Sequence, residues 1–181
     1  MDAGQSIDEF LVAIEKRAFR MAEIATGSRE DALDLVQDAM LGLVKSYGDR
    51  ESADWPPLFY RILQSRIRDW YRRNRVRNRF RVWLGGLHGH DDDERSDAIQ
   101  NLPDRQPGIE RQLAGEDAMA HLQAALQDLP LRQQQAFLLR AWEGMDVSAT
   151  AFAMGCSEGS VKTHYSRAIH RLREQLEDHW P

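Results

Sequence analysis

The chain has 181 residues, of which 42% are hydrophobic and 29% are charged, with a formal net charge of −5. That length accommodates one or two small globular domains, and the single cysteine excludes an intrachain disulfide and a cysteine-based zinc site. No apolar run approaches the roughly 18–20 residues that span a bilayer. The acidic N-terminus, residues 1–4, lacks the features of a signal peptide, so we expect a cytoplasmic protein without membrane insertion.

Turn residues and helical periodicity predict three helices in the first half of the chain. The first two cover residues 7–25 and 29–47, and Thr26-Gly27-Ser28 separates them. The third opens at Trp55-Pro56-Pro57, where proline suits the first helical turn. We find no strand-like alternation and no internal repeat. The sequence therefore predicts an all-α fold.

The third predicted helix becomes strongly basic. Residues 60–83 contain nine arginines and one acidic residue, Asp69, with aromatic residues among them. Because the whole chain is net negative, this is a local concentration of positive charge. Guanidinium groups pair with phosphates and aromatic rings stack on unpaired bases, so the segment is typical of a surface for single-stranded or melting DNA. The alternative is a solvated basic helix whose apolar side belongs to the core, as the helical spacing favours for Tyr60, Ile62, Leu63, Ile67 and Trp70.

Residues 85–108 differ in composition from the segments around them. They are rich in Gly, Asp and Pro, which predicts a flexible acidic linker. The run Asp91 to Glu94, preceded by His88 and His90, carries groups that coordinate metals. No predicted helix or strand holds other ligands beside it, so the interpretation as a solvated linker is favoured. We expect no metal and no cofactor.

The last part of the chain predicts four helices. The first two cover residues 109–129 and 131–143, and a short helix over 147–154 is followed by a glycine turn and a helix that Ser157 caps. Two helices joined by such a turn make a helix-turn-helix, whose second helix enters the major groove of DNA. The alternative is an ordinary helical hairpin packed into a core. Cys156 in the bend is interpreted as a small packing residue, with a redox sensor as the alternative.

Three motifs give the chain a resemblance to a known family. Residues 31–40, DALDLVQDAM, are similar to a (D/E)D-(L/V)-V-Q-(D/E) helix; Leu58 to Ile62 lead into the basic helix; and residues 126–130 precede a helix-turn-helix containing residues 157–162. In this order, the motifs resemble a bacterial RNA polymerase sigma factor of the sigma-70 family, of the extracytoplasmic-function type. The resemblance covers nearly the whole chain except the linker.

The resemblance implies two small helical domains. A region 2-like domain would occupy residues 1–84, a flexible linker residues 85–108, and a region 4-like domain with the helix-turn-helix residues 109–181. Such a protein is not an enzyme: it directs core polymerase to promoters by recognising duplex −35 DNA and capturing melted −10 DNA. The implied partners are core polymerase, through its β′ clamp and β flap, promoter DNA and an anti-sigma factor. We hypothesise that the free protein is autoinhibited or held by such a partner.

The resemblance also implies three sets of site residues. The positions for core polymerase are Asp34, Leu35, Val36, Gln37 and Asp38. The positions for −10 DNA are Tyr60, Arg61, Gln64, Ser65, Arg66, Asp69, Trp70, Arg72 and Arg73. The positions for −35 DNA are Ser157, Ser160, Lys162, Thr163, His164, Ser166 and Arg167. Ser65 stands where the family commonly has asparagine and His164 where arginine is frequent, so the family's usual promoter sequence is not transferred.

Two other functional classes fit parts of the sequence. A polymerase-independent helix-turn-helix repressor or activator would bind duplex DNA alone and usually as a dimer, but the chain offers no heptad zipper and no ligand-binding domain. A metal-dependent nucleic-acid enzyme would use residues 91–94, and a divalent-metal-dependent cleavage assay would expose it.

Overall fold

All regular secondary structure that the computed structural model describes, over residues 6–85 and 110–176, is helical, which confirms the all-α prediction. Gly85, the first residue of the predicted linker, belongs to helix α3, and the rest of the linker, its acidic run included, lies outside these residues. No helix within the two described stretches is both long and apolar enough to cross a membrane. The elements are α1 Ile7–Thr26, α2 Arg29–Tyr47, the 3₁₀ turn η1 Ser52–Asp54, α3 Trp55–Gly85, α4 Glu110–Gln127, α5 Leu131–Phe137, the π-helical turn η2 Leu138–Trp142, α6 Val147–Met154 and α7 Glu158–Gln175.

Short polar residues fix where four of the helices begin. Ser6 forms a capping box at the start of α1, in which its Oγ accepts from the backbone N–H of Glu9 at 3.2 Å. Ser28, Asp146 and Ser157 cap α2, α6 and α7 through their side-chain oxygens. Each cap satisfies a backbone donor that a helix leaves unpaired at its N-terminus. These local signals explain why the starts of these helices could be predicted from the sequence.

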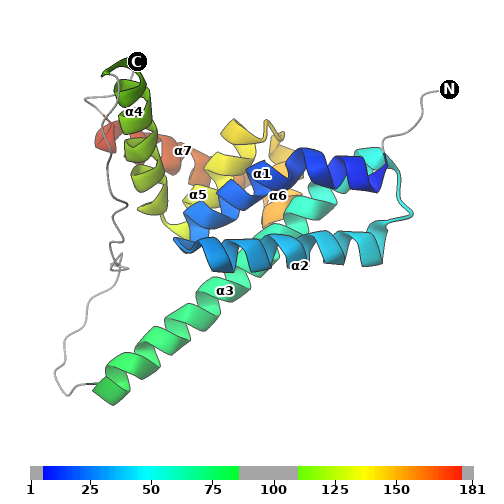
Figure 1. Cartoon of the computed structure of the whole chain (residues 1–181), viewed down its shortest axis with the longest axis horizontal. Helices are drawn as coiled ribbons and strands as arrows, with labels where there is room; N and C mark the ends of the chain where they lie inside the picture. The colour runs from blue at the N-terminus through cyan, green and yellow to red at the C-terminus, as the bar shows by residue number, and fades with distance from the viewer. Residues whose placement is uncertain (1–5, 86–109, 177–181) are drawn as a thin grey trace.

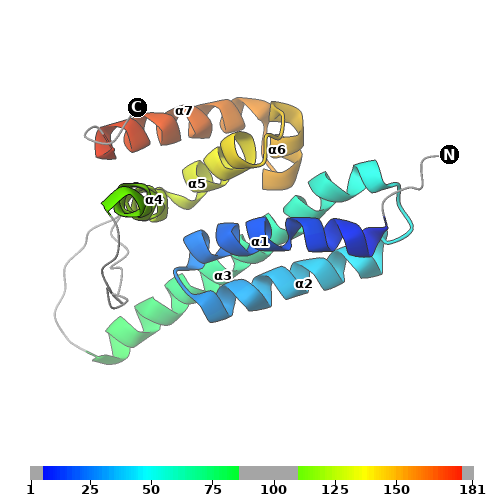
Figure 2. The ribbon, with the colours of Figure 1, turned by 45° about the horizontal axis from the view of Figure 1, so that its top comes forward.

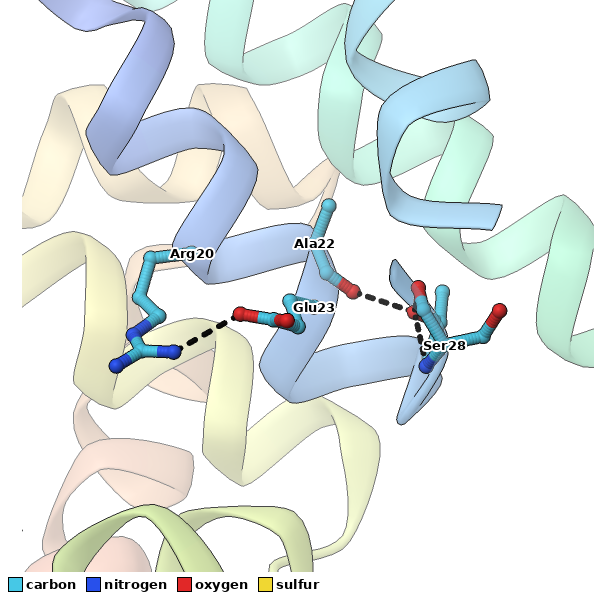
Figure 3. Close-up of polar contacts among 5 residues, drawn as sticks. Arg20, Ala22, Glu23 and Ser28 are labelled. Atoms are coloured by element: carbon cyan, nitrogen blue, oxygen red, sulfur yellow. Dashed lines mark hydrogen bonds and ion pairs between the residues drawn. The ribbon is translucent and has the colours of Figure 1, made fainter. Parts of the chain in front are cut away.

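The junction between α1 and α2 is held by contacts within the turn. The hydroxyl of Thr26 donates to the Ala22 carbonyl at 2.9 Å, and the backbone N–H of Ser28 donates to the Thr26 hydroxyl at 3.2 Å (Figure 3). On the last turns of α1, Arg20 donates to Glu23 at 2.9 Å, also drawn in Figure 3. The turn therefore sends α2 back along α1 in a defined orientation.

Helices α1, α2 and α3 form an N-terminal unit around an apolar core. Leu43, Phe59 and Leu63 are fully buried there, and the ring of Phe10 lies 5.8 Å from that of Trp55. The core occupies the first half of α3, so the rest of this long helix extends past α1 and α2 (Figure 1). The basic part of α3 is therefore carried on a helix that is anchored at its start.

Helices α4 to α7 form a C-terminal unit whose buried apolar residues belong to the same cluster as those of the N-terminal unit. Leu126, Leu138, Leu139, Met154 and Leu172 are fully buried in it. Helix α5 packs on α7, and α6 packs on α7 across a tight turn. The structure thus contains the predicted helix-turn-helix, formed by α6 and α7.

The turn between α6 and α7 requires a residue that tolerates a left-handed backbone. Gly155 has φ 63° and ψ 45°, and its N–H caps the end of α6. Because that conformation costs other residues roughly 1–2 kcal/mol, we expect Gly155→Ala to lower the free energy of unfolding by about that amount. Gly159, within the first turn of α7, is a matched control, since a Cβ there would meet only the Ser157 Oγ at 3.9 Å. Chemical denaturation should show no such loss for Gly159→Ala, and equal losses in both variants would contradict the explanation.

The two units lie against each other in the structure (Figure 2). Helix α3 packs on α6, and α1 contacts α4. At the second of these contacts, Arg20 and Ile24 of α1 share a small hollow with Leu122, Leu126 and Trp142. The sequence predicted two units but gave no indication of this contact between them.

Candidate nucleic-acid interfaces

The nine positions predicted to contact −10 DNA fall within about four turns of α3, because an α-helix has about 3.6 residues per turn. Their exposure differs. The exposed members are Arg61, Arg66, Arg72 and Arg73. The half-buried members are Ser65, Asp69 and Trp70. The remaining two, Tyr60 and Gln64, are 2% and 0% exposed. The structure therefore offers mainly arginines to an incoming phosphate backbone.

Tyr60 and Gln64 are held by contacts inside the protein. The side chain of Gln64 donates to the Met21 sulfur at 2.9 Å, and the ring of Tyr60 packs edge-on against Phe59 at 5.3 Å. Burial, and then the neighbouring Glu143 carboxylate, raise the pKa of Tyr60. Even so, neither the Tyr60 hydroxyl nor Gln64 Oε1 makes a hydrogen bond of standard geometry with any described residue. In this arrangement both side chains are removed from solvent.

Two arginines of α3 reach across to the C-terminal unit. Arg61 donates to the carbonyl of Phe152 at 2.8 Å and its guanidinium lies 4.5 Å from the centre of the Phe152 ring. Arg68 donates to the carbonyl of Met154 at 2.8 Å. Burial, and then the charge of Arg132, lower the pKa of Arg68. Sequence reasoning placed both arginines in the basic segment and assigned Arg61, but not Arg68, to −10 DNA. Nothing in the local pattern indicates a distant carbonyl partner for either of them.

The far part of the basic segment keeps an aromatic edge. Trp70 and Tyr71 are half-buried neighbours whose rings meet at 69° with centroids 5.5 Å apart, and burial raises the pKa of Tyr71. Asp69 forms an ion pair with Arg72 one turn later, which reduces the positive charge at that point. Arg66, which precedes this aromatic pair in the sequence, and Arg73, which follows it, are both exposed. Arginines next to aromatic rings suit contacts with phosphates and unpaired bases.

The predicted polymerase contact on α2 separates into two kinds of residue. Asp34, Gln37 and Asp38 are exposed, whereas Leu35 and Val36 are buried in the core of the N-terminal unit. Asp34 and Asp38 are four residues apart and share one face of the helix. The acidic face is thus available to a partner, while the two apolar members position the helix.

Sequence reasoning missed an apolar strip beside that acidic face. Leu33, Leu41 and Val44 are large apolar side chains on α2 with exposed fractions of 44%, 58% and 44%. With Gln37 they follow helical spacings of four, four and three residues, which place them along one side. We call these four residues the α2 strip. Several exposed apolar side chains along one side of a helix are a candidate protein contact, and the signal in the sequence was three apolar residues beyond those needed for the buried face.

The predicted −35 residues lie on the exposed side of α7. Lys162, Thr163, Ser166 and Arg167 are exposed, while Val161 and other residues of the opposite side are buried. Ser157 and Ser160 are already hydrogen-bonded to each other at the start of the helix. Ser157 Oγ accepts from the backbone N–H of Ser160 at 3.1 Å and lies 2.9 Å from the Ser160 hydroxyl. The face therefore combines a cation at each end with short polar groups.

His164 differs from the rest of this set because it is half-buried. Burial, and then the charges of Arg132 and Arg167, lower the pKa of His164 from 6.5, and its Nδ1 has no hydrogen-bond partner in the described part of the chain. We therefore expect a neutral imidazole at pH 7. Below pH 6.5 the unfolded chain takes up a proton before the folded protein does, so this residue lowers stability as the pH falls. An NMR titration of His164 should give a midpoint below 6.5, and a midpoint above that value would contradict this environment.

The residues of both units match known family models. Residues 7–77, covering α1, α2 and most of α3, match "Sigma-70 region 2", and residues 120–172, in α4 to α7, match "Sigma-70, region 4".

Named relatives agree with these matches. An RNA polymerase sigma-E factor of Streptomyces antibioticus is 32% identical over 150 residues, covering 81% of this chain and 71% of that protein. One of Streptomyces coelicolor is 30% identical, covering 93% and 85%. The ECF RNA polymerase sigma factor SigM of Mycobacterium tuberculosis is 27% identical, covering 94% and 77%.

A solved structure shares the fold. The sigma factor RpoE of Bartonella quintana, crystallised in complex with the anti-sigma factor NepR, matches with a TM-score of 0.66 and 21% identity, covering 96% of this chain and 98% of that one.

Proposed function

Because the chain belongs to the sigma-70 family of RNA polymerase sigma factors, which direct promoter-specific transcription initiation, we propose that it recognises promoters through two separate DNA contacts. Helix α7 reads duplex −35 DNA, and the basic part of α3 captures melted −10 DNA. Its relatives include extracytoplasmic-function sigma factors, as the sequence motifs indicated.

The assignment of α7 to the −35 element is supported by its exposed face. Lys162 and Arg167 can donate to guanine O6 and N7 or to phosphates, and the methyl group of Thr163 can meet thymine. Ser157 fixes the start of α7. In a helix-turn-helix the second helix lies in the major groove, and its N-terminal residues contact the bases. A neutral His164 would contribute a hydrogen bond and no positive charge.

The assignment of α3 to the −10 element requires help from a partner. Opening a base pair costs about 1.4 kcal/mol per step, whereas stacking one captured base returns about 1–3 kcal/mol. Opening several steps therefore exceeds what Trp70 and its neighbours return. Core RNA polymerase must share the cost, which makes it an obligatory partner.

The exposed face of α2 is the proposed contact with the β′ clamp of core polymerase. Asp34 and Asp38 offer negative charge, and the α2 strip offers apolar area next to it. Leu35 and Val36 act indirectly, by packing α2 on the N-terminal core. The C-terminal unit would contact the β flap. The two polymerase contacts would then hold the two DNA contacts apart along the promoter.

The domain division follows the same proposal. The region 2-like domain occupies residues 1–84, the linker residues 85–108 and the region 4-like domain residues 109–181. A tether of this length raises the effective concentration of the second contact once the first is made. We further propose that an anti-sigma protein regulates the chain. The chain itself acts in the cytoplasm, without catalytic chemistry or a cofactor of its own.

One observation supports this function above the others. A single chain presents exposed arginines with an aromatic edge on α3 and a capped helix with exposed Lys162 and Arg167 on α7. Run-off transcription with purified bacterial core polymerase and genomic promoter fragments tests it. Promoter-specific transcripts should appear only when the chain and core are both present. Tight operator binding and regulation without core polymerase would support a repressor or activator instead, and divalent-metal-dependent DNA cleavage would support an enzyme.

A further inference from the structure

His164 lies between the exposed face of α7 and the helix that packs against α7. It shares one side of α7 with Ser160 and Arg167, which stand four residues before it and three residues after it. Helix α5 packs along α7 (Figure 2). The Nδ1 atom of His164 is buried, whereas the residue as a whole keeps part of its surface exposed. The imidazole therefore has one covered edge and one open to a ligand.

The buried nitrogen of His164 has charged neighbours but no hydrogen-bond partner. No described residue forms a hydrogen bond with Nδ1. The charged groups that act on the imidazole are the guanidinium of Arg132 on α5 and that of Arg167 on α7, while α6 carries no titratable side chain. Burial and these two charges disfavour an imidazolium ion and lower the pKa of His164 from 6.5. The ring is therefore neutral at pH 7.

The environment of Nδ1 also decides which ring nitrogen carries the proton. A neutral imidazole has one N–H group and one lone pair, so the surroundings of one nitrogen fix what the other presents. A proton on Nδ1 of His164 would be a buried donor without an acceptor, and it would face the cation of Arg132. A lone pair on Nδ1 is instead attracted by that charge. The proton therefore resides on Nε2, and α7 presents a single neutral donor at this position.

Arg132 is held by contacts that do not involve the histidine. Its Nη1 donates to the carbonyl of Met154 at 2.8 Å and to Gln135 Oε1 at 3.3 Å. The first contact anchors the guanidinium at the end of α6, directly before the Gly155 turn that leads into α7. None of the ion pairs found between described residues includes Arg132. Its positive charge is thus fixed in place beside the recognition helix.

We propose that Arg132 is a positioning residue for −35 recognition, which holds His164 with its proton on Nε2, and that this N–H reads N7 of a purine. The inference rests on the proposed function only for the assignment of α7 to duplex DNA. Adenine and guanine both present N7 as an acceptor in the major groove, whereas cytosine presents an amino donor and thymine places a methyl group beside its O4. A single neutral donor therefore accepts either purine, while an arginine at this position would select guanine through two donors.

Nitrogen NMR of the free chain tests the first half of this inference. The full chain is labelled in its six histidines, and His164→Gln identifies the signals of residue 164. At neutral pH the ring should carry its proton on Nε2. Arg132→Gln should raise the titration midpoint of His164 and admit the form with the proton on Nδ1. Arg132→Lys should keep the midpoint and the tautomer of the natural chain, because it retains the charge.

Arg171→Gln is the matched control for the loss of charge. It removes a cation from an exposed position of α7 whose charge does not act on His164, so the midpoint and the tautomer should not change. Arg68 still donates to the Met154 carbonyl when Arg132 is replaced, and circular dichroism should show that both Arg132 variants are folded. If Arg132 only supported the fold, Arg132→Gln would leave the tautomer of His164 as it is.

Base analogues test the second half. Duplexes are selected from a random pool by the full chain, alone and with core polymerase, so that the target does not depend on a transcript. Each purine of the selected sequence is then replaced in turn by its 7-deaza analogue, which lacks the N7 acceptor. At one position the replacement should lower the affinity of the natural chain about three- to tenfold, as expected for one neutral hydrogen bond.

Two substitutions of the histidine connect that purine to Nε2. The amide of asparagine ends near the place of Nδ1, so His164→Asn should show no further loss with the 7-deaza analogue. The longer glutamine carries its amide N–H₂ to the place of Nε2, so His164→Gln should keep most of the loss. Arg132→Gln should reduce the loss, and Arg132→Lys should restore it.

A proton on Nδ1 in the natural chain, or a midpoint that Arg132→Gln leaves unchanged, would overturn the role of Arg132. A selected sequence in which no purine N7 is coupled to His164, or no preferred sequence at all, would overturn the reading of N7. Neither measurement depends on transcription. If both gave the expected result and no promoter-specific transcripts appeared, the proposed function would be refuted and this inference would stand.

Discussion

Asp38→Arg is expected to lower the affinity of the chain for core RNA polymerase by about a hundredfold. Asp38 and Asp34 share an exposed face of α2 and lie next to the α2 strip, so a charge reversal there opposes a basic partner surface. Losing one member of a buried interfacial charge pair costs about 2–5 kcal/mol, and reversal adds repulsion to that loss. Equilibrium binding of the labelled full chain to purified core polymerase measures the effect.

Asp49→Arg provides the matched control. It makes the same charge reversal at an exposed residue just after α2, away from the proposed contact face. Its affinity for core polymerase should equal that of the natural chain. Retention of full affinity by Asp38→Arg, or an equal loss in both variants, would remove α2 from the polymerase contact.

The buried members of the same motif should behave differently. Leu35 is in the core, so Leu35→Ala should act through stability, at a cost of about 2–5 kcal/mol. Polymerase binding by that variant should recover at temperatures where the domain stays folded. The motif thus combines a contact face with the residues that hold it in place.

Arg167→Ala is the second large expected effect, with a loss of about 10–100-fold in affinity for −35 duplex DNA. The residue is exposed on α7, and one bidentate arginine contact to guanine contributes about 1–3 kcal/mol of discrimination. Fluorescence anisotropy, with a duplex taken from a promoter that the transcription assay recovers, measures the loss.

Arg50→Ala makes the same change of net charge at an exposed residue between α2 and η1, and is the control for non-specific attraction. It should weaken duplex binding only slightly. If both variants lost affinity to the same extent, α7 would contribute only non-specific electrostatic attraction to DNA and would not recognise bases in the groove.

Much of the fold could be predicted because its signals are local. The helix starts at Ser28, Asp146 and Ser157 carry capping side chains, and the stop at Gly155 needs a left-handed residue. Such signals depend on a few neighbouring residues. The predicted single helix over residues 131–143 was less accurate, since α5 is followed by a π-helical turn that sequence periodicity does not encode.

The arrangement of the site depended on contacts between distant residues. The basic pattern on α3 identified arginines, but not that Arg61 and Arg68 donate to carbonyls 91 and 86 residues later in the chain. Helical spacing indicated a core role for Tyr60, whereas Gln64 gave no such signal and is nonetheless fully buried. Charge and periodicity describe one helix at a time, and packing between helices decides which polar groups face solvent.

In the proposed mechanism, this chain opens promoter DNA only together with core polymerase. A promoter fragment with 2-aminopurine in its −10 region reports unstacking as a rise in fluorescence. We predict a rise when core polymerase and the chain are both present, and none with either alone. A rise with the chain alone, or no rise with both on a promoter that supports transcription, would contradict the claim.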